Sequence, residues 1–195
     1  SPALPVQTLQ DFVALAKARP GQLNFGSSGV GTSLHLTGEM LRLRTGIELT
    51  HVPYRGSSAV STALIAGEIQ ISFDALPAVA GLVSAGRVRA IAVTTEARLR
   101  ELPDVPTAAE AGLPDFVVTS WVGPFGPAGM SPATVEQLSR AFVEAALSEE
   151  GSARLRALGA TPVGEGAAAF DAFWRRDMAR WKKVVREANV PIEDY

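Results

Sequence analysis

The sequence of 195 residues contains no cysteine, which excludes disulfides, thiol nucleophiles and cysteine-ligated metal sites. It also lacks an excess of basic charge, because 18 Lys and Arg residues stand against 20 Asp and Glu residues. Nucleic-acid binding needs a basic stripe for phosphates, so the net charge of −2 argues against a general nucleic-acid-binding protein. No window of about 18 uninterrupted apolar residues occurs, so no membrane-spanning helix is predicted. Residues 1–5 also lack the basic and apolar regions of a secretory signal peptide.

A composition of 47% hydrophobic and 19% charged residues is typical of a globular protein. In the first part of the chain, helical and strand-like apolar patterns alternate. Helices are predicted over residues 7–18, 32–44, 59–66 and 77–84, and strands over residues 23–25, 47–52, 69–73 and 88–94. This alternation predicts an α/β fold, with helices on both faces of a mostly parallel sheet.

The pattern changes in the last part of the chain. Residues 116–125 form an extended run that is long for one strand of a small domain, so we predict that they connect two lobes. Ser131 is the expected cap of a long helix whose first turn contains Pro132. The predicted elements beyond residue 100 are a short helix at 108–111 with a capping box between Thr107 and Glu110, helices at 133–147, 151–158 and 167–188, and a short strand at 161–163.

The strongest chemical signal is a glycine- and serine-rich loop between a predicted strand and a predicted helix, Gly26-Ser-Ser-Gly-Val-Gly31-Thr32-Ser33. It resembles a phosphate-binding loop, except that Thr32 replaces the lysine that contacts the β- and γ-phosphates. Backbone N–H groups, hydroxyls and a helix N-terminus together suit a small anion such as a carboxylate. The alternative is a plain strand-to-helix turn with a Thr or Ser cap. Neither GxSxG nor GxGxxG occurs, so the serine-hydrolase and dinucleotide-binding motifs do not apply.

Other polar loops follow the predicted strands and, in a parallel sheet, would lie at the same edge. Tyr54 and Arg55 occupy one of them, where Arg55 could pair with a carboxylate or simply be a solvated turn residue. Asp74 occupies another, where it could receive a ligand amine or hydroxyl or cap its own turn. His35 and His51 have no third ligand at metal-site spacing, so we predict structural or solvated histidines.

Several ordered motifs resemble one family. They are Leu23-Asn-Phe-Gly-Ser-Ser-Gly-Val-Gly-Thr-Ser-Leu-His-Leu36, His51-Val-Pro-Tyr-Arg-Gly56, Phe73-Asp-Ala-Leu-Pro77, Ala90-Ile-Ala-Val-Thr94 and Leu102-Pro-Asp-Val-Pro-Thr-Ala-Ala-Glu-Ala-Gly112. On these residues the chain resembles the substrate-binding receptors of tripartite tricarboxylate transporters, also called Bug receptors. The resemblance implies a periplasmic protein without catalytic activity or cofactor, built as two lobes of the type II periplasmic-binding-protein kind. It also implies that the lobes close on a small carboxylate (a di- or tricarboxylate, an acidic amino acid or an aromatic acid), which is then handed to a membrane permease.

The resemblance implies roles for individual residues. Residues 27–33 match a loop that grips a ligand carboxylate through backbone N–H groups and hydroxyls, and residues 54–56 match a Pro-Tyr-Lys/Arg-Gly turn. Asp74 and Ala75 match a loop that contacts the distal end of the ligand. Trp121 lies near the hinge. The predicted ligand-binding residues are therefore Ser27, Ser28, Gly29, Gly31, Thr32, Ser33, Tyr54, Arg55, Gly56, Asp74 and Ala75. No catalytic or metal-binding residue is predicted.

The chain is short for this family, whose members begin with roughly another third of chain that holds most of the first lobe. We expect residues 1–118 to form the ligand-binding second lobe. Residues 119–195 would then contain the crossover strand, the late part of the first lobe and the C-terminal helix. An incomplete first lobe would expose apolar side chains such as Phe142 and Trp174, which predicts a homodimer, swapped or not. The alternative function is a protein-interaction or signalling module without high-affinity solute binding, and a small α/β enzyme is less favoured.

Overall fold

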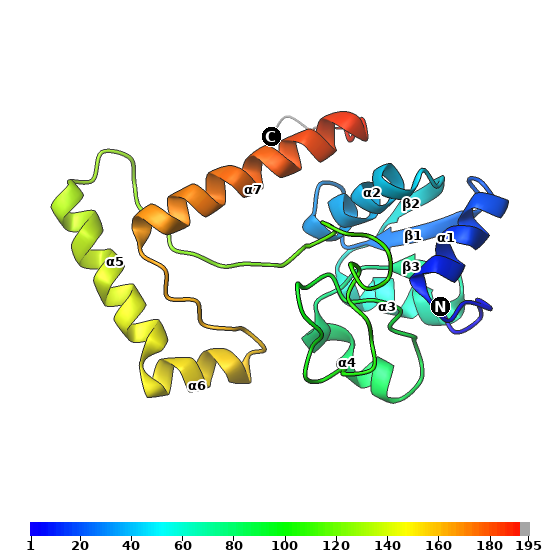
Figure 1. Ribbon diagram of the computed structural model, residues 1–195, viewed down its shortest axis with the longest axis horizontal. Helices are drawn as coiled ribbons and strands as arrows, with labels where there is room; N and C mark the ends of the chain where they lie inside the picture. Colours follow the sequence, from blue (N-terminus) through cyan, green and yellow to red (C-terminus); the bar gives the residue numbers. More distant parts are fainter. Residues whose placement is uncertain (192–195) are drawn as a thin grey trace. The chain divides into compact units, whose positions relative to one another are not determined.

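The protein, studied as a computed structural model, is described over residues 1–191. It divides into two compact units (Figure 1). Unit 1 consists of Ser1–Ser120 and the described residues from Lys183 onward, and unit 2 is Trp121–Lys182. Among the described residues, none of the helices combines the length and the apolar character needed to cross a membrane.

Unit 1 is built on a three-stranded parallel sheet. β1 (Leu23–Ser27) lies between β2 (Leu49–Pro53) and β3 (Ile71–Ser72), which gives the strand order β2-β1-β3 (Figure 1). Ser27 lies opposite Pro53, and Gly26 lies opposite Ser72. Because the strands are parallel, their carboxyl ends meet at one edge of the sheet. The predicted α/β fold with a parallel sheet is therefore confirmed.

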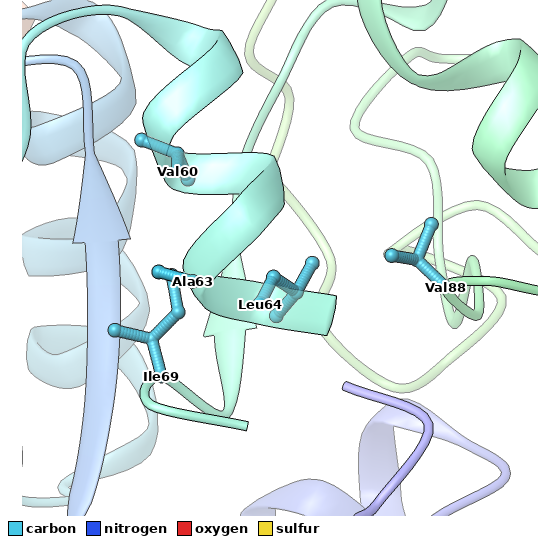
Figure 2. Close-up of a cluster of buried hydrophobic side chains, with 5 residues drawn as sticks. All are labelled: Val60, Ala63, Leu64, Ile69 and Val88. Carbon is cyan, nitrogen blue, oxygen red and sulfur yellow. The ribbon is translucent and has the colours of Figure 1, made fainter. Parts of the chain in front are cut away.

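Helices cover both faces of this sheet. The helices of this region are α1 (Leu9–Ala18), α2 (Ser33–Thr45), α3 (Ser57–Ala66) and α4 (Leu76–Ser84); α2 and α3 contact β1, and α4 contacts α3. Successive residues of a strand face opposite sides: the Phe25 ring lies against Gly38 of α2, whereas the adjacent Gly26 faces Val60 of α3. Figure 2 shows the core on the α3 side, where five buried side chains cluster: Val60, Ala63, Leu64, Ile69 and Val88.

Local sequence signals explain where the helices begin and end. At the start of α1, the Thr8 hydroxyl accepts the Asp11 N–H while the Asp11 carboxylate accepts the Thr8 N–H, which forms a capping box. At the start of α2, the Thr32 hydroxyl accepts the His35 N–H. Gly46 ends α2 in the left-handed region, at φ 67°, which glycine adopts without strain. These signals place the helices close to the predicted bounds.

The predicted strand over residues 88–94 does not form, so that prediction is wrong. The Val93 N–H donates to the Pro106 carbonyl (2.9 Å), and the Val93 carbonyl accepts the Ala108 N–H (2.8 Å). These bonds make only an isolated parallel bridge outside the sheet. A strand needs a hydrogen-bonded neighbour, and the edge strand β3 is only two residues long. The segment therefore satisfies its backbone groups against a later loop.

Two smaller predictions also change. The segment 161–163 is irregular rather than a strand, because no paired strand lies beside it among the described residues. The predicted helix at 108–111 is only a turn, although its capping box is present. The Thr107 N–H donates to a Glu110 carboxylate oxygen (2.8 Å), and the Glu110 N–H donates to the Thr107 hydroxyl (3.1 Å). The cap therefore forms without a following helix.

Unit 2 consists of helices and irregular segments. α5 (Pro132–Leu147) is capped by Ser131 as predicted, α6 (Glu149–Ala157) follows directly, and α7 (Ala167–Glu187) begins in this unit. An aromatic cluster supports α7, because the Trp121 ring meets the rings of Phe170 and Phe173 edge to face, with centroids 5.5 and 5.6 Å away. By contrast, no side chain of α5 is buried.

Candidate functional site

Three loops meet at the carboxyl edge of the sheet in unit 1. The first follows β1 and comprises residues 27–33, which we call the glycine loop. The second follows β2, and the third follows β3. The Tyr54 N–H donates to the Ser27 carbonyl (2.9 Å), which ties the start of the second loop to the first. The Ser57 hydroxyl donates to Asp74 Oδ1 (3.2 Å), which ties the start of α3 to the third loop.

The glycine loop is held by hydrogen bonds within itself. The Thr32 hydroxyl donates to the Gly29 carbonyl (2.8 Å) while it caps α2. The Ser27 side chain is fully buried, and its hydroxyl donates to the same carbonyl (3.0 Å). Gly29 and Gly31 have φ values of 144° and 75°, which favour glycine at both positions. Ser27 and Thr32 therefore shape the loop, and their hydroxyls are already engaged.

Two histidines support this loop from beneath. The Gly31 N–H donates to His35 Nδ1 (3.0 Å), and His51 Nε2 lies 2.6 Å from Ser27 Oγ. The two imidazoles stack on each other, with centroids 3.7 Å apart and planes 12° apart. The Phe25 ring packs on both imidazoles, with its centroid 4.8 Å from that of His51 and 6.0 Å from that of His35. The sequence predicts structural or solvated histidines, but neither spacing nor motif indicates that both bond to the glycine loop.

Burial favours the neutral form of one of these histidines, His51. Desolvation, followed by the charge of His35, lowers the pKa of His51 to about 4. His35 is only 3% exposed, and its Nε2 lies 3.6 Å from the buried carboxylate of Glu39. Glu39 is in turn paired with Arg42, whose Nη1 lies 2.6 Å from Oε2. A buried polar network therefore lies directly below the loop.

Other predicted site residues present free polar groups. Within the described part of the chain, the hydroxyls of Ser28 and Ser33 have no hydrogen-bond partner, and Arg55 is exposed without an ion pair. Asp74 Oδ1 accepts the Ala75 N–H (2.9 Å), whereas its buried Oδ2 has no partner among the described residues. Hydroxyl and guanidinium donors suit an anion, and a free carboxylate oxygen suits a hydrogen-bond donor.

The remaining predicted residues frame the same edge. Gly56 precedes α3 with φ 88°, and the helix has no side-chain cap at this end. The Tyr54 side chain is half-buried, and desolvation followed by the charge of Glu68 raises the pKa of its phenol. No group of three or more potential metal ligands lies together in the described residues.

The match to known proteins covers almost the whole chain. Residues 1–190 match the family model described as tripartite tricarboxylate transporter family receptor. The chain belongs to this family. Its members include solved periplasmic binding proteins, and the family is one of receptors rather than enzymes.

Three relatives show how far the similarity to this receptor family extends. BugT of Bordetella pertussis is 33% identical over 99% of the chain and 59% of that protein. The structure of R. palustris Rpa4515 with adipate is 35% identical, with a TM-score of 0.81 over 96% of this chain and 63% of that one. MatC (Rpa3494) from Rhodopseudomonas palustris, solved with bound malate, is 26% identical, with a TM-score of 0.75 over 94% and 64%. The chain thus spans about three-fifths of each relative.

Trp121, the predicted hinge residue, is the first residue of unit 2. Its indole N–H donates to Asp177 Oδ2 (2.9 Å), and the Trp181 indole N–H donates to the same oxygen (3.2 Å). Asp177 therefore ties the extended segment that begins at Trp121 to α7. A role of Trp121 in lobe closure stays a prediction.

Proposed function

We propose that the chain is the ligand-binding part of an extracytoplasmic receptor that binds a small carboxylate and delivers it to the permease of a tripartite tricarboxylate-type transporter. The observation that supports this most directly comes from the carboxyl edge of the sheet in unit 1. There the loops after β1 and β2 carry Ser28, Ser33 and Arg55, whose side-chain donors have no partner among the described residues. Hydroxyl and guanidinium donors at this edge suit carboxylates. Two similar proteins were solved with carboxylates, Rpa4515 with adipate and MatC with malate.

In this proposal the eleven predicted residues divide into two groups. Ser28, Ser33 and Arg55 contact the carboxylate, with Tyr54 as a wall and Asp74 Oδ2 as an acceptor for a hydroxyl or amine of the solute. The others set the shape of the loops: Ser27, Gly29, Gly31, Thr32, Gly56 and Ala75. The N–H groups of Gly29 and Gly31 already donate to Ser27 Oγ and His35 Nδ1, so the remaining loop amides are better placed to bind an anion.

The wider assignments follow from family membership and are part of the proposal. The solute is a di- or tricarboxylate, an acidic amino acid or an aromatic acid, and binding takes place in the periplasm. Residues 1–118 act as the second lobe of the receptor, and Trp121 lies near the hinge. The chain needs no cofactor and performs no chemistry on the solute, as expected of a member of a receptor family.

A thermal-shift screen against small carboxylates tests the proposal. A ligand that binds only the folded protein raises the melting temperature by mass action, and a concentration of about 100 times Kd stabilises by about 2.7 kcal/mol. For a chain of this size that corresponds to roughly 5–11 °C. We expect such a shift for at least one acid. No shift with any acid at high millimolar concentration would refute solute binding by this chain.

Two variants locate the binding site. Loss of a hydrogen bond to a charged group weakens binding by about 1.5–3 kcal/mol, so Arg55→Ala and Ser28→Ala should each raise Kd about tenfold to hundredfold. Arg87→Ala and Ser84→Ala are matched controls. Both residues are exposed and lie at or just after the C-terminal end of α4, whereas the proposed site lies before its N-terminal end. Unchanged shifts in both test variants, or equal losses in the controls, would remove the proposed site.

A second candidate function rests on unit 2. α5 buries no side chain, and Leu138, Phe142 and Leu147 are exposed on it. An apolar surface of this kind tends to be covered by association, so it supports a homodimer or a role as a protein-interaction module without tight solute binding. Sedimentation at micromolar concentration separates these functions. A monomer that binds a carboxylate supports the receptor alone, whereas a dimer without solute binding supports the interaction module.

A further inference from the structure

The glycine loop is hydrogen-bonded to two histidines, of which His35 is buried and His51 is half-buried. We propose that His35 and His51 are positioning residues, which hold the glycine loop in its carboxylate-binding shape. This inference rests on the proposed function for what the loop binds, but the positioning itself is a property of the chain alone.

The hydrogen-bond directions define the role of each imidazole. Because the Gly31 N–H donates to His35 Nδ1, that nitrogen must be unprotonated and the ring proton must be on Nε2. The hydroxyl of Ser27 donates its one proton to the Gly29 carbonyl, so its oxygen accepts from His51 Nε2–H. The two rings therefore contact the two ends of the loop with opposite polarity. One accepts from the Gly31 end, and the other donates to the Ser27 end.

The stack explains why the two contacts act together. The imidazoles lie 3.7 Å apart and are nearly parallel, and the Phe25 ring lies 4.8 Å from His51 and 6.0 Å from His35. Movement of either ring therefore displaces the other. Because His35 and Phe25 are buried, the stack has no free space into which it can relax. The loop ends are thus fixed by one packed unit rather than by independent hydrogen bonds.

Protonation of His51 would not break its contact with the loop. A second proton on His51 would leave its Nε2–H donation to Ser27 intact, and its lowered pKa keeps it neutral above about pH 4. The charged groups near the pair are Glu39, 3.6 Å from His35 Nε2, and Arg42, which is bonded to Glu39.

Amide hydrogen exchange and NMR on the full chain test the positioning role without any ligand. In His35→Phe the ring and its packing remain but the acceptor is lost, so the Gly31 amide should exchange about two- to tenfold faster. In His35→Asn the side-chain oxygen replaces Nδ1 and should restore much of the protection. The Gln70 amide, which donates to the Asn24 carbonyl far from the loop, serves as the internal control. Unchanged Gly31 exchange in His35→Phe, or equal acceleration at Gln70, would overturn the positioning role.

Thermal-shift assays with adipate and malate as probes connect the positioning role to binding. The shift should be smaller in His35→Phe than in the wild-type chain and largely recovered in His35→Asn. If Gly31 responds as expected but neither these acids nor the wider carboxylate panel shifts the melting temperature, the positioning stands and the proposed receptor function fails.

Discussion

Gly38→Ala is a sharp test of how α2 packs on the sheet. Gly38 lies inside α2, and a Cβ at this position would overlap the ring of Phe25, which is completely buried. The ring cannot move freely, because it is stacked on His51 with centroids 4.8 Å apart. An added methyl group must therefore displace the helix, the ring, or the histidine pair below the glycine loop.

The expected magnitude combines two opposing effects. Alanine is favoured over glycine inside a helix by about 1 kcal/mol. Overpacking of a close-packed core costs roughly 1–3 kcal/mol, and at this position the overlap involves ring atoms in a fully packed site. We therefore expect a net destabilisation of up to about 2 kcal/mol. Gly81→Ala is the matched control: it lies inside α4, nothing meets a Cβ there, and only the helix-propensity gain of about 1 kcal/mol applies.

Urea unfolding followed by far-UV circular dichroism measures both variants. Tryptophan fluorescence would report on unit 2, because all three tryptophans (Trp121, Trp174 and Trp181) lie there. Gly38→Ala should lower the unfolding midpoint while Gly81→Ala raises it. In a Phe25→Leu background the penalty of Gly38→Ala should shrink, because residues in contact do not act additively. Equal stabilisation by both alanines, or an undiminished penalty in the Phe25→Leu background, would refute the close approach of α2 to the ring.

Three further predictions concern other parts of the chain. Since the pKa of His51 is about 4 in the folded state and 6.5 ordinarily, the unfolded state binds more protons between these values. Stability should therefore fall by about 1–2 kcal/mol, allowing for partial exposure, as pH drops from 6.5 to 4, and His51→Gln should flatten that part of a urea-stability profile. Asp177→Ala should destabilise unit 2 by about 1–3 kcal/mol in fluorescence-detected unfolding, because the indoles of Trp121 and Trp181 lose their acceptor, whereas Asp177→Asn keeps an oxygen there. Thr107→Ala should cost about 1 kcal/mol through the lost cap, and Thr107→Ser should restore it; equal melting temperatures for the two would contradict this role.

The sequence predicts most of unit 1 because local and periodic signals agree there. Apolar spacing marks the four helices, and Gly46 and Gly67 end two of them in the left-handed region. The alternation of helix and strand is enough to require a parallel sheet, and that in turn places the three loops at one edge. The segment 88–94 has the same apolar character as a strand. Whether it pairs depends on its neighbours, and periodicity alone cannot show that β3 is too short.

The candidate site is predictable at the level of loops but not of atoms. Ser27 and Ser28 are adjacent in the same motif, yet one hydroxyl is buried and engaged and the other has no partner among the described residues. The difference arises because Ser27 ends β1, where a side chain must point to one face of the sheet, and that face holds His51. A loop pattern records which residue types are present. It does not record which of them the strand geometry turns inward.

The two histidines show what the sequence patterns cannot predict, namely a contact that depends on strand pairing and helix packing. Spacing and motif place His35 on a helix and His51 on a strand, and no pattern joins them because 16 residues separate them in the chain. They meet because β2 pairs in parallel with β1, so that His51 lies opposite Phe25, while Gly38 allows α2 to approach the same ring. One strand register and one glycine thus build the stack, and the stack sets the shape of the glycine loop. We therefore expect substitutions at the histidines to affect binding through the shape of the loop.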